Sequence, residues 1–182
     1  MKYLNSFNSF LSESQNDIII DIIKPEHEDA VVDVLYSSFG FLEDSKESLR
    51  KRIQPRLSNG ISIYLSLNGN IVGCYLLNEK SVQTFIDDIR SGRINDFPES
   101  ETKIYLDNIQ GRGLQGIALS IYPEFRNMGF GKMLKDWVYN LSYDYIWGVA
   151  DKKLENIDYW KSRRNIIAES PTRWATIEFF KN

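Results

Sequence analysis

One stretch of the chain decides how the rest is interpreted, and it reads GIALSIYPEFRNMGFGKML from Gly116 to Leu134. Apolar residues alternate with smaller or polar ones between Ile117 and Ile121, which predicts a strand. Pro123 ends that strand, because proline has no N–H to donate to a ladder. From Lys132 onward apolar residues recur at helical spacing, so a helix follows.

The turn between this strand and this helix reads R-x-x-G-x-G, from Arg126 to Gly131. Glycines allow backbone N–H groups to approach a ligand closely. The start of a helix adds unpaired N–H groups and the positive end of its dipole, and Arg126 and Lys132 add charge. The combination predicts a diphosphate site, and an ordinary turn whose glycines serve packing is the alternative. The spacing is neither that of a P-loop nor G-x-G-x-x-G.

The run Ile121-Tyr-Pro-Glu-Phe-Arg126-Asn-Met-Gly129-Phe-Gly131 resembles the acetyl-CoA signature of the GNAT N-acetyltransferases. The resemblance implies an α/β fold with a twisted, mostly antiparallel central sheet flanked by helices. It also implies that CoA enters a cleft between two splayed parallel strands. The cofactor would be acetyl-CoA, held by Leu119, Ser120, Ile121, Arg126, Asn127, Met128, Gly129, Phe130, Gly131, Lys132 and Asn156.

Composition narrows the class of protein. The chain has 182 residues, 42% of them hydrophobic and 26% charged, and a net charge of −3. This is typical of a globular protein with no general attraction to nucleic acid or anionic membranes. A single cysteine, Cys74, and a single histidine, His27, predict no disulfide framework and no metal site. No signal peptide or membrane span is expected, so a cytoplasmic location is the default expectation.

We expect a polar leader at 1–16 and one acetyltransferase-like domain at 17–182, with an insertion at about 79–113. The near-continuous apolar run from Ile18 to Ile23 predicts a strand buried on both faces. Asn68-Gly69-Asn70 predicts a hairpin between strands 61–67 and 71–77. Cys74 is expected in the core. Helices are expected near 25–39, 45–57, 82–91, 132–141 and 151–164, and further strands at 103–109, 143–150 and 174–180.

The catalytic groups are less defined. In the resembled family a second signature on a later helix ends in a tyrosine that protonates the departing thiolate. Here Trp160 falls on that position, and indole is not a usable acid. The neighbouring Tyr159 is therefore the candidate acid, with a packed aromatic as the alternative. The candidate bases are Glu79, Asp107 and an ordered water chain.

The resemblance implies an N-acetyltransferase acting on a primary amine, and dimers are common in that family, so a homodimer is one expected assembly. Acidic residues in the insertion favour a small cationic amine or a peptide amine, although a solubilising surface explains them equally well. Basic residues such as Arg50, Lys51 and Lys152 make an RNA-linked amine, such as aminoacyl-tRNA, the second choice. A non-catalytic acyl-CoA-binding regulatory domain is the rival, favoured by Trp160. The acidic residues of the insertion are Glu79, Asp87, Asp88, Asp96, Glu99, Glu101 and Asp107.

Overall fold

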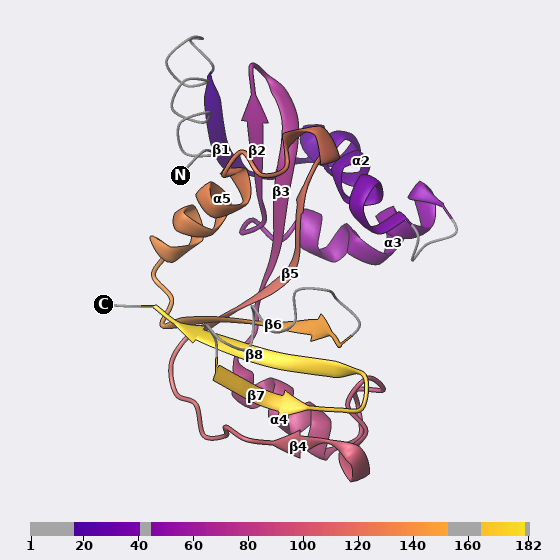
Figure 1. Ribbon diagram of the computed structural model, residues 1–182, viewed down its shortest axis with the longest axis vertical. Helices are drawn as coiled ribbons and strands as arrows, with labels where there is room; N and C mark the ends of the chain where they lie inside the picture. The colour runs from indigo at the N-terminus through magenta and orange to yellow at the C-terminus, as the bar shows by residue number, and fades with distance from the viewer. Residues whose placement is uncertain (1–16, 41–44, 153–164, 181–182) are drawn as a thin grey trace. The chain divides into compact units, whose positions relative to one another are not determined.

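The computed structural model describes residues 17–40, 45–152 and 165–180 (Figure 1). These residues form four α-helices and eight strands. The strands make one mixed sheet in the order β1-β2-β3-β5-β6-β8-β7-β4. The chain divides into two compact units, which we describe separately. Of the described residues, those up to 77 and those at 118–141 form unit one, and those at 78–117 and from 142 on form unit two.

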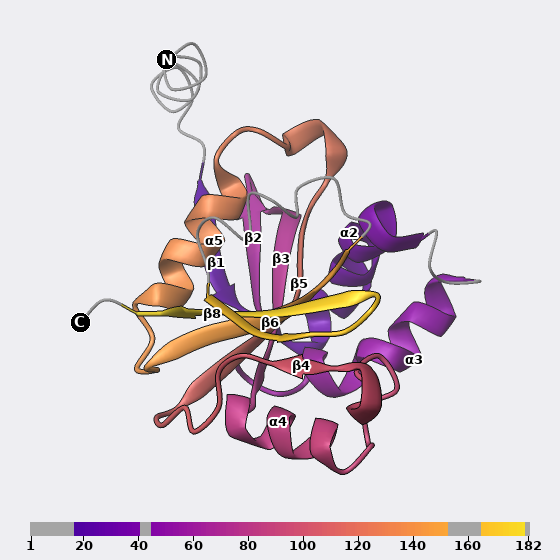
Figure 2. The same ribbon diagram turned by 60° about the horizontal axis from the view of Figure 1, so that its bottom comes forward.

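Unit one contains the first three strands and three of the helices. Figures 1 and 2 show α5 on one side of β1–β3, with α2 and α3 on the other side. Strands β3 and β5 both continue into unit two. The elements are β1 (Ile18–Ile22), a 3-10 turn (Pro25–His27), α2 (Glu28–Phe39), α3 (Lys46–Leu57), β2 (Ile63–Leu67), β3 (Asn70–Glu79), the last part of β5 (Gly113–Ile121), a second 3-10 turn (Pro123–Phe125) and α5 (Phe130–Tyr139).

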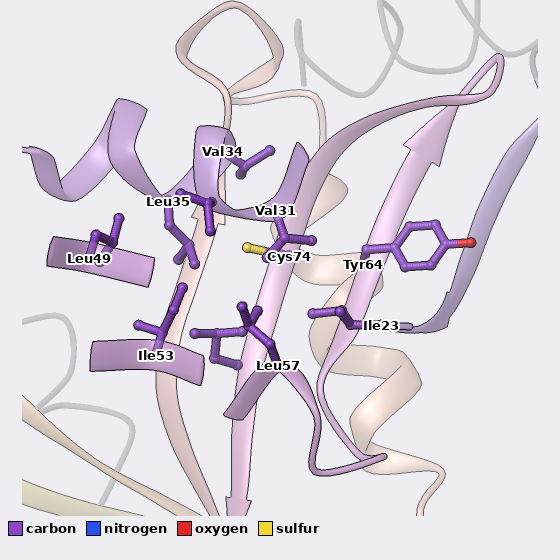
Figure 3. Close-up of a cluster of buried hydrophobic side chains, with 11 residues drawn as sticks. Ile23, Val31, Val34, Leu35, Leu49, Ile53, Leu57, Tyr64 and Cys74 are labelled. Atoms are coloured by element: carbon purple, nitrogen blue, oxygen red, sulfur yellow. The ribbon is translucent and has the colours of Figure 1, made fainter. Parts of the chain in front are cut away.

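The core of unit one lies between β2, β3 and the inner faces of α2 and α3 (Figure 3). Val31 and Leu35 from α2 meet Leu49 and Ile53 from α3, because both helices place apolar residues at three- and four-residue intervals. Cys74 of β3 is fully buried in this cluster, and its burial raises the pKa of the thiol above the ordinary range. The expectation that Cys74 is a core residue is confirmed.

Unit two contains the second half of the sheet and one helix. Helix α4 lies against the strands of this unit (Figure 2), and its apolar face packs on Trp147 and Ile167. The Trp147 indole N–H donates to the Lys80 carbonyl over 2.7 Å, so the one polar group of this large buried side chain has a hydrogen-bond partner. The elements are α4 (Val82–Arg90), a 3-10 turn (Glu99–Glu101), β4 (Lys103–Ile104), the first part of β5, β6 (Tyr145–Asp151), β7 (Asn165–Glu169) and β8 (Arg173–Phe179).

One strand pair is parallel. Strands β5 and β6 run together from Gly113 opposite Tyr145 to Gly116 opposite Gly148. The other pairs with a described register are antiparallel: β1–β2, β2–β3, β6–β8, β7–β8 and β4–β7. The predicted fold class, a mostly antiparallel sheet flanked by helices and containing a parallel pair, is confirmed.

Several predicted elements have different bounds or burial. Strand β1 lies at an edge of the sheet, and Ile19 is 50% exposed, so the prediction of a strand buried on both faces is wrong. The strand expected at 103–109 is reduced to the two residues of β4. Strand β7 was not predicted. Most of the helix expected at 151–164 lies outside the described residues.

Two findings concern the whole described chain. No helix in it is both long and apolar enough to cross a membrane. Within residues 17–40, 45–152 and 165–180, no three side chains among His, Cys, Asp and Glu come together as a metal site would require.

Candidate functional site

The turn that follows β5 is held at both ends by backbone hydrogen bonds. The Tyr122 N–H donates to the Val72 carbonyl of β3 over 2.9 Å. The Phe125 and Arg126 N–H groups then donate to the carbonyls of Tyr122 and Pro123, at 2.9 and 3.3 Å. Pro123 occupies the first position of this short 3-10 turn, where its missing N–H costs nothing. We call residues 122–131 the phosphate turn.

The second half of the phosphate turn leaves backbone donors open at the start of α5. Asn127 and Gly129 have positive φ angles of 64° and 87°, which turn successive peptide groups toward one side. The N–H groups of Lys132 and Met133 both donate to the Gly129 carbonyl at 3.0 Å. Among the described residues, the Phe130 and Gly131 N–H groups at the start of the helix have no backbone acceptor. They lie at the positive end of the helix dipole, which favours an anion.

The predicted cofactor residues from Leu119 to Lys132 lie together around this turn, but their side chains have different roles. Phe130 is buried and packs near Phe125, so only its backbone is available to a ligand. The Lys132 ammonium pairs with Asp136 one turn further along α5. The Arg126 guanidinium donates from Nε to the Ile121 carbonyl over 3.2 Å and from Nη2 to Ser38 Oγ over 2.9 Å.

The end of β5 presents its two faces to different helices. Ser120 is buried, and its Oγ donates to the Val34 carbonyl of α2 over 3.0 Å. Leu119 faces the other way, since a Cβ added at Gly131 would lie 3.8 Å from Leu119 Cδ2. Because the side chains are committed to these contacts, the backbone of residues 119–121 is the part of the strand that a ligand could pair with. Met128 is half-buried, and Asn127 is exposed.

In unit two, the end of the parallel ladder exposes apolar side chains. Ile117 directly follows the last paired residue of β5 and is 38% exposed, and Val149 directly follows that of β6 and is 39% exposed. The backbones of β5 and β6 lie close together just before this point: a Cβ added at Gly148 would lie 3.1 Å from the Gly116 carbonyl oxygen. An exposed apolar pair at the end of a ladder suits an extended, partly apolar ligand.

The two candidate bases are each paired with a different arginine. Glu79 accepts from Arg112 Nη2 at 3.1 Å and from the Tyr143 hydroxyl at 3.3 Å. Asp107 accepts from Arg90 Nη2 at 2.7 Å. The structure therefore places both carboxylates in ion pairs and does not join them in one constellation. The candidate acid, Tyr159, and the predicted cofactor contact Asn156 lie outside the described residues.

Several charged residues considered for acceptor binding are also partnered. In the insertion, Asp88 bonds to Lys80 at 2.8 Å and to Arg93, and these hydrogen bonds lower the pKa of its carboxyl group. On α3, Arg50 pairs with Asp29 of α2 and lies 3.9 Å from Glu47. Part of the acidic character of the insertion and part of the basic character of α3 is therefore taken up by ion pairs within the protein.

Ser38 is the residue of this site that the sequence did not indicate. It lies in the last turn of α2, 88 positions before Arg126, and contacts both Arg126 and Ser120. A lone serine near the end of a helix carries no signal of its own. Only the packing of α2 against β5 brings its hydroxyl to the phosphate turn.

No protein-family model and no curated protein sequence matches this chain. Solved structures do match it. A GNAT-family acetyltransferase from Streptococcus agalactiae is 11% identical with a TM-score of 0.64, over 91% of this chain and 96% of that one. The PaiA N-acetyltransferase of Thermoplasma acidophilum, solved in complex with coenzyme A, is 12% identical with a TM-score of 0.56, over 90% and 99%.

The third comparison is with a polyamine N-acetyltransferase of Drosophila melanogaster, which catalyses formation of N-acetylagmatine. It is 10% identical with a TM-score of 0.60, over 90% of this chain and all of that one. At such low identity the likeness concerns the fold. This chain thus has the fold of the GNAT acetyltransferases along most of its length.

Proposed function

We propose that this protein is an acetyl-CoA-dependent N-acetyltransferase that moves an acetyl group to a primary amine. One observation carries the proposal: in a GNAT-like fold, the turn from Arg126 to Gly131 opens backbone donors at the start of α5. A diphosphate is the ligand for which such a combination of dipole, open N–H groups and arginine is suited. The similar PaiA enzyme was solved with coenzyme A, which contains a diphosphate.

In this proposal the backbone around Leu119–Ile121 pairs with the pantetheine arm, and Phe130 and Gly131 donate their N–H groups to the diphosphate. The bound cofactor supplies the thioester whose C–S bond is broken as the amine nitrogen bonds to the carbonyl carbon. The amine must lose a proton, and the thiolate must gain one. Orientation of the two reactants can contribute roughly 7–11 kcal/mol in well-aligned systems, so few proton-transfer groups are needed.

For proton transfer we propose Tyr159 as the acid, and Glu79, Asp107 or an ordered water as the base. The partners of the two carboxylates give a simple way to compare them. Glu79 is also contacted by a phenol, whereas Asp107 is held by Arg90 and by the neighbouring Asn108. We compare the turnover of Glu79→Gln and Asp107→Asn with that of Asp87→Asn, which makes the same type of change on the exposed face of α4. A residue that acts as the base should lose turnover, whereas a surface charge should not.

For the acceptor we propose a small cationic amine or a peptide amine, with an RNA-linked amine second. Arg50 and Lys51 pair with acidic neighbours, which reduces the positive charge available to an RNA-linked acceptor. The rival is a non-catalytic acyl-CoA-binding domain, supported by tryptophan at position 160, where the family signature has its tyrosine. A homodimer remains part of the proposal.

The test measures thiol release from acetyl-CoA with a panel of amines, peptides and aminoacyl-tRNA, and CoA affinity by calorimetry. Gly129→Glu places a carboxylate in the phosphate turn and should abolish CoA binding and turnover together. Gly60→Glu is the matched control, since Gly60 also has a positive φ, of 73°, and has nothing within 4 Å of an added Cβ. CoA binding without turnover on any acceptor would favour the rival, and absence of CoA binding by the wild type would overturn both.

A further inference from the structure

The Arg126 guanidinium is held in place by a chain of hydrogen bonds that reaches into helix α2. Arg126 Nη2 lies 2.9 Å from Ser38 Oγ, which lies 2.6 Å from Ser120 Oγ, which lies 3.0 Å from the Val34 carbonyl oxygen. We call Ser38 and Ser120 the serine pair. It joins the last turn of α2 and the end of β5 to the phosphate turn.

The chemistry of the groups fixes the direction of this chain. A guanidinium can only donate and a carbonyl can only accept. The Ser120 hydroxyl donates its single proton to the Val34 carbonyl, so it must accept from Ser38. The Ser38 hydroxyl therefore donates to Ser120 and accepts from Arg126. All three bonds run one way, from the cation to the helix carbonyl, which is the arrangement in which successive hydrogen bonds strengthen one another.

This chain fixes the arginine at two points. The second point is the Nε–H, which donates to the Ile121 carbonyl over 3.2 Å. A flexible, exposed arginine would otherwise lose considerable side-chain entropy on ordering against a ligand. Here groups of the protein itself order the guanidinium, while its remaining N–H groups stay available. The buried end of the chain, at Ser120, is 2% exposed.

We propose that Ser38 and Ser120 are positioning residues of the diphosphate site, acting through Arg126. The inference rests on the proposed function, because the diphosphate concerned is that of CoA. Neither serine hydroxyl contacts the ligand. The serine pair holds the Arg126 guanidinium at the turn that leads into α5, so that in the proposed complex its charge and the backbone donors of α5 act on the same anion.

The experiment is a double-mutant cycle on the full chain, read as the dissociation constant for CoA. Ser38→Ala should weaken CoA binding by roughly fivefold to tenfold, because a guanidinium that has lost this anchor must be ordered when the ligand binds. Arg126→Met, which keeps an apolar stem and removes the donors, should weaken it further. In the Arg126→Met background, Ser38→Ala should change nothing more, because its effect passes through the guanidinium.

The chain offers a matched control and a rescue. Ser37 lies next to Ser38 on α2, and its hydroxyl donates to the same Val34 carbonyl at 2.7 Å, but it is exposed and bonds to Val34 rather than Arg126. Ser37→Ala should therefore leave CoA affinity unchanged. Ser38→Thr retains the hydroxyl and should restore most of the wild-type affinity. Ser120→Ala gives an independent variant that should behave like Ser38→Ala.

Two results would overturn the inference while leaving the proposed function intact. One is a Ser38→Ala protein that binds CoA as the wild type does. The other is full additivity of Ser38→Ala and Arg126→Met, which would mean that Ser38 acts through the packing of α2. A wild-type protein that does not bind CoA would instead overturn the proposed function, and the inference with it.

Discussion

Gly113 and Tyr145 lie directly opposite one another in the parallel ladder, and the tyrosine ring fills the space beside the glycine. A Cβ built on Gly113 would lie 2.4 Å from Tyr145 Cε2 and 2.7 Å from its hydroxyl oxygen. Tyr145 is fully buried, so its ring cannot move into solvent. The absence of a side chain at position 113 is therefore a condition for β5 and β6 to pair.

We expect Gly113→Ala to destabilise the protein by about 1–3 kcal/mol, the usual cost of overpacking a well-packed interior. Urea unfolding followed by circular dichroism measures the change. Gly131→Ala is the control, since its added methyl group would lie at an ordinary contact distance of 3.8 Å from Leu119. Equal stability of the two variants would contradict the packing described for the ladder.

Tyr145→Phe should also destabilise the protein, for a different reason. The Val82 N–H, at the start of α4, donates to the Tyr145 hydroxyl over 3.1 Å in a buried setting. Without that oxygen the donor is left unsatisfied, which costs about 1–3 kcal/mol. The matched change is Tyr143→Phe, whose hydroxyl meets the exposed carboxylate of Glu79. A loss in Tyr145→Phe no larger than in Tyr143→Phe would contradict the assignment.

Asp21 binds a backbone N–H of β1, which is an edge strand of the sheet among the described residues. The Ile23 N–H points toward β2, where it bonds to Ser62, so by alternation the Ile22 N–H points outward, and the Asp21 carboxylate accepts it at 2.8 Å. We expect Asp21→Val to raise self-association, measured by light scattering after size-exclusion chromatography. Asp87→Val makes the same change of charge on α4 and should leave the molecular mass unchanged. A similar increase in both variants would assign the effect to charge alone.

Acid should remove the stabilisation that Asp88 supplies. Hydrogen bonds from Lys80 and Arg93 lower the pKa of this carboxyl group below its ordinary value of 3.8. A carboxyl group with a lowered folded-state pKa stabilises the protein above the unfolded-state pKa, and the stabilisation is lost as the pH falls through the folded-state value. Asp88→Asn should therefore be less stable than wild type at pH 6, with the difference shrinking below pH 4. Urea midpoints at pH 6, 4 and 3 measure this, and a constant difference would contradict it.

The elements that were predicted correctly carry their signal within a few residues. Asn68-Gly69 supplies the two positive φ angles, 52° and 80°, that a two-residue hairpin turn requires. Ser45 caps α3 by accepting from the Ser48 N–H at 3.1 Å. The strand, turn and helix between Gly113 and Tyr139 are equally local, because strand, proline, glycines and helix follow one another without a gap. Such features are legible because no distant residue is needed to form them.

What the sequence did not indicate depends on distant partners. Whether the run around Ile19 is buried depends on its place in the strand order, and β1 ends at an edge. The strand expected at 103–109 is limited to the two residues of β4 that pair with β7, and β7 itself was not predicted. The contact of Ser38 with Arg126 spans 88 positions, and neither residue type implies the other. The ion pairs of Glu79 and Asp107 with separate arginines likewise follow from tertiary packing alone.

The burial of the single cysteine has a practical consequence. In the thiol-release assay of the proposed activity, the reagent would react with any coenzyme released into solution, whereas Cys74, fully enclosed and with a raised pKa, is a poor nucleophile in the native chain. Colour formed under native conditions therefore measures product alone. The same reagent added with denaturant should reveal one further equivalent per chain, so that one dye counts turnover in the folded protein and the loss of the fold in the unfolded one.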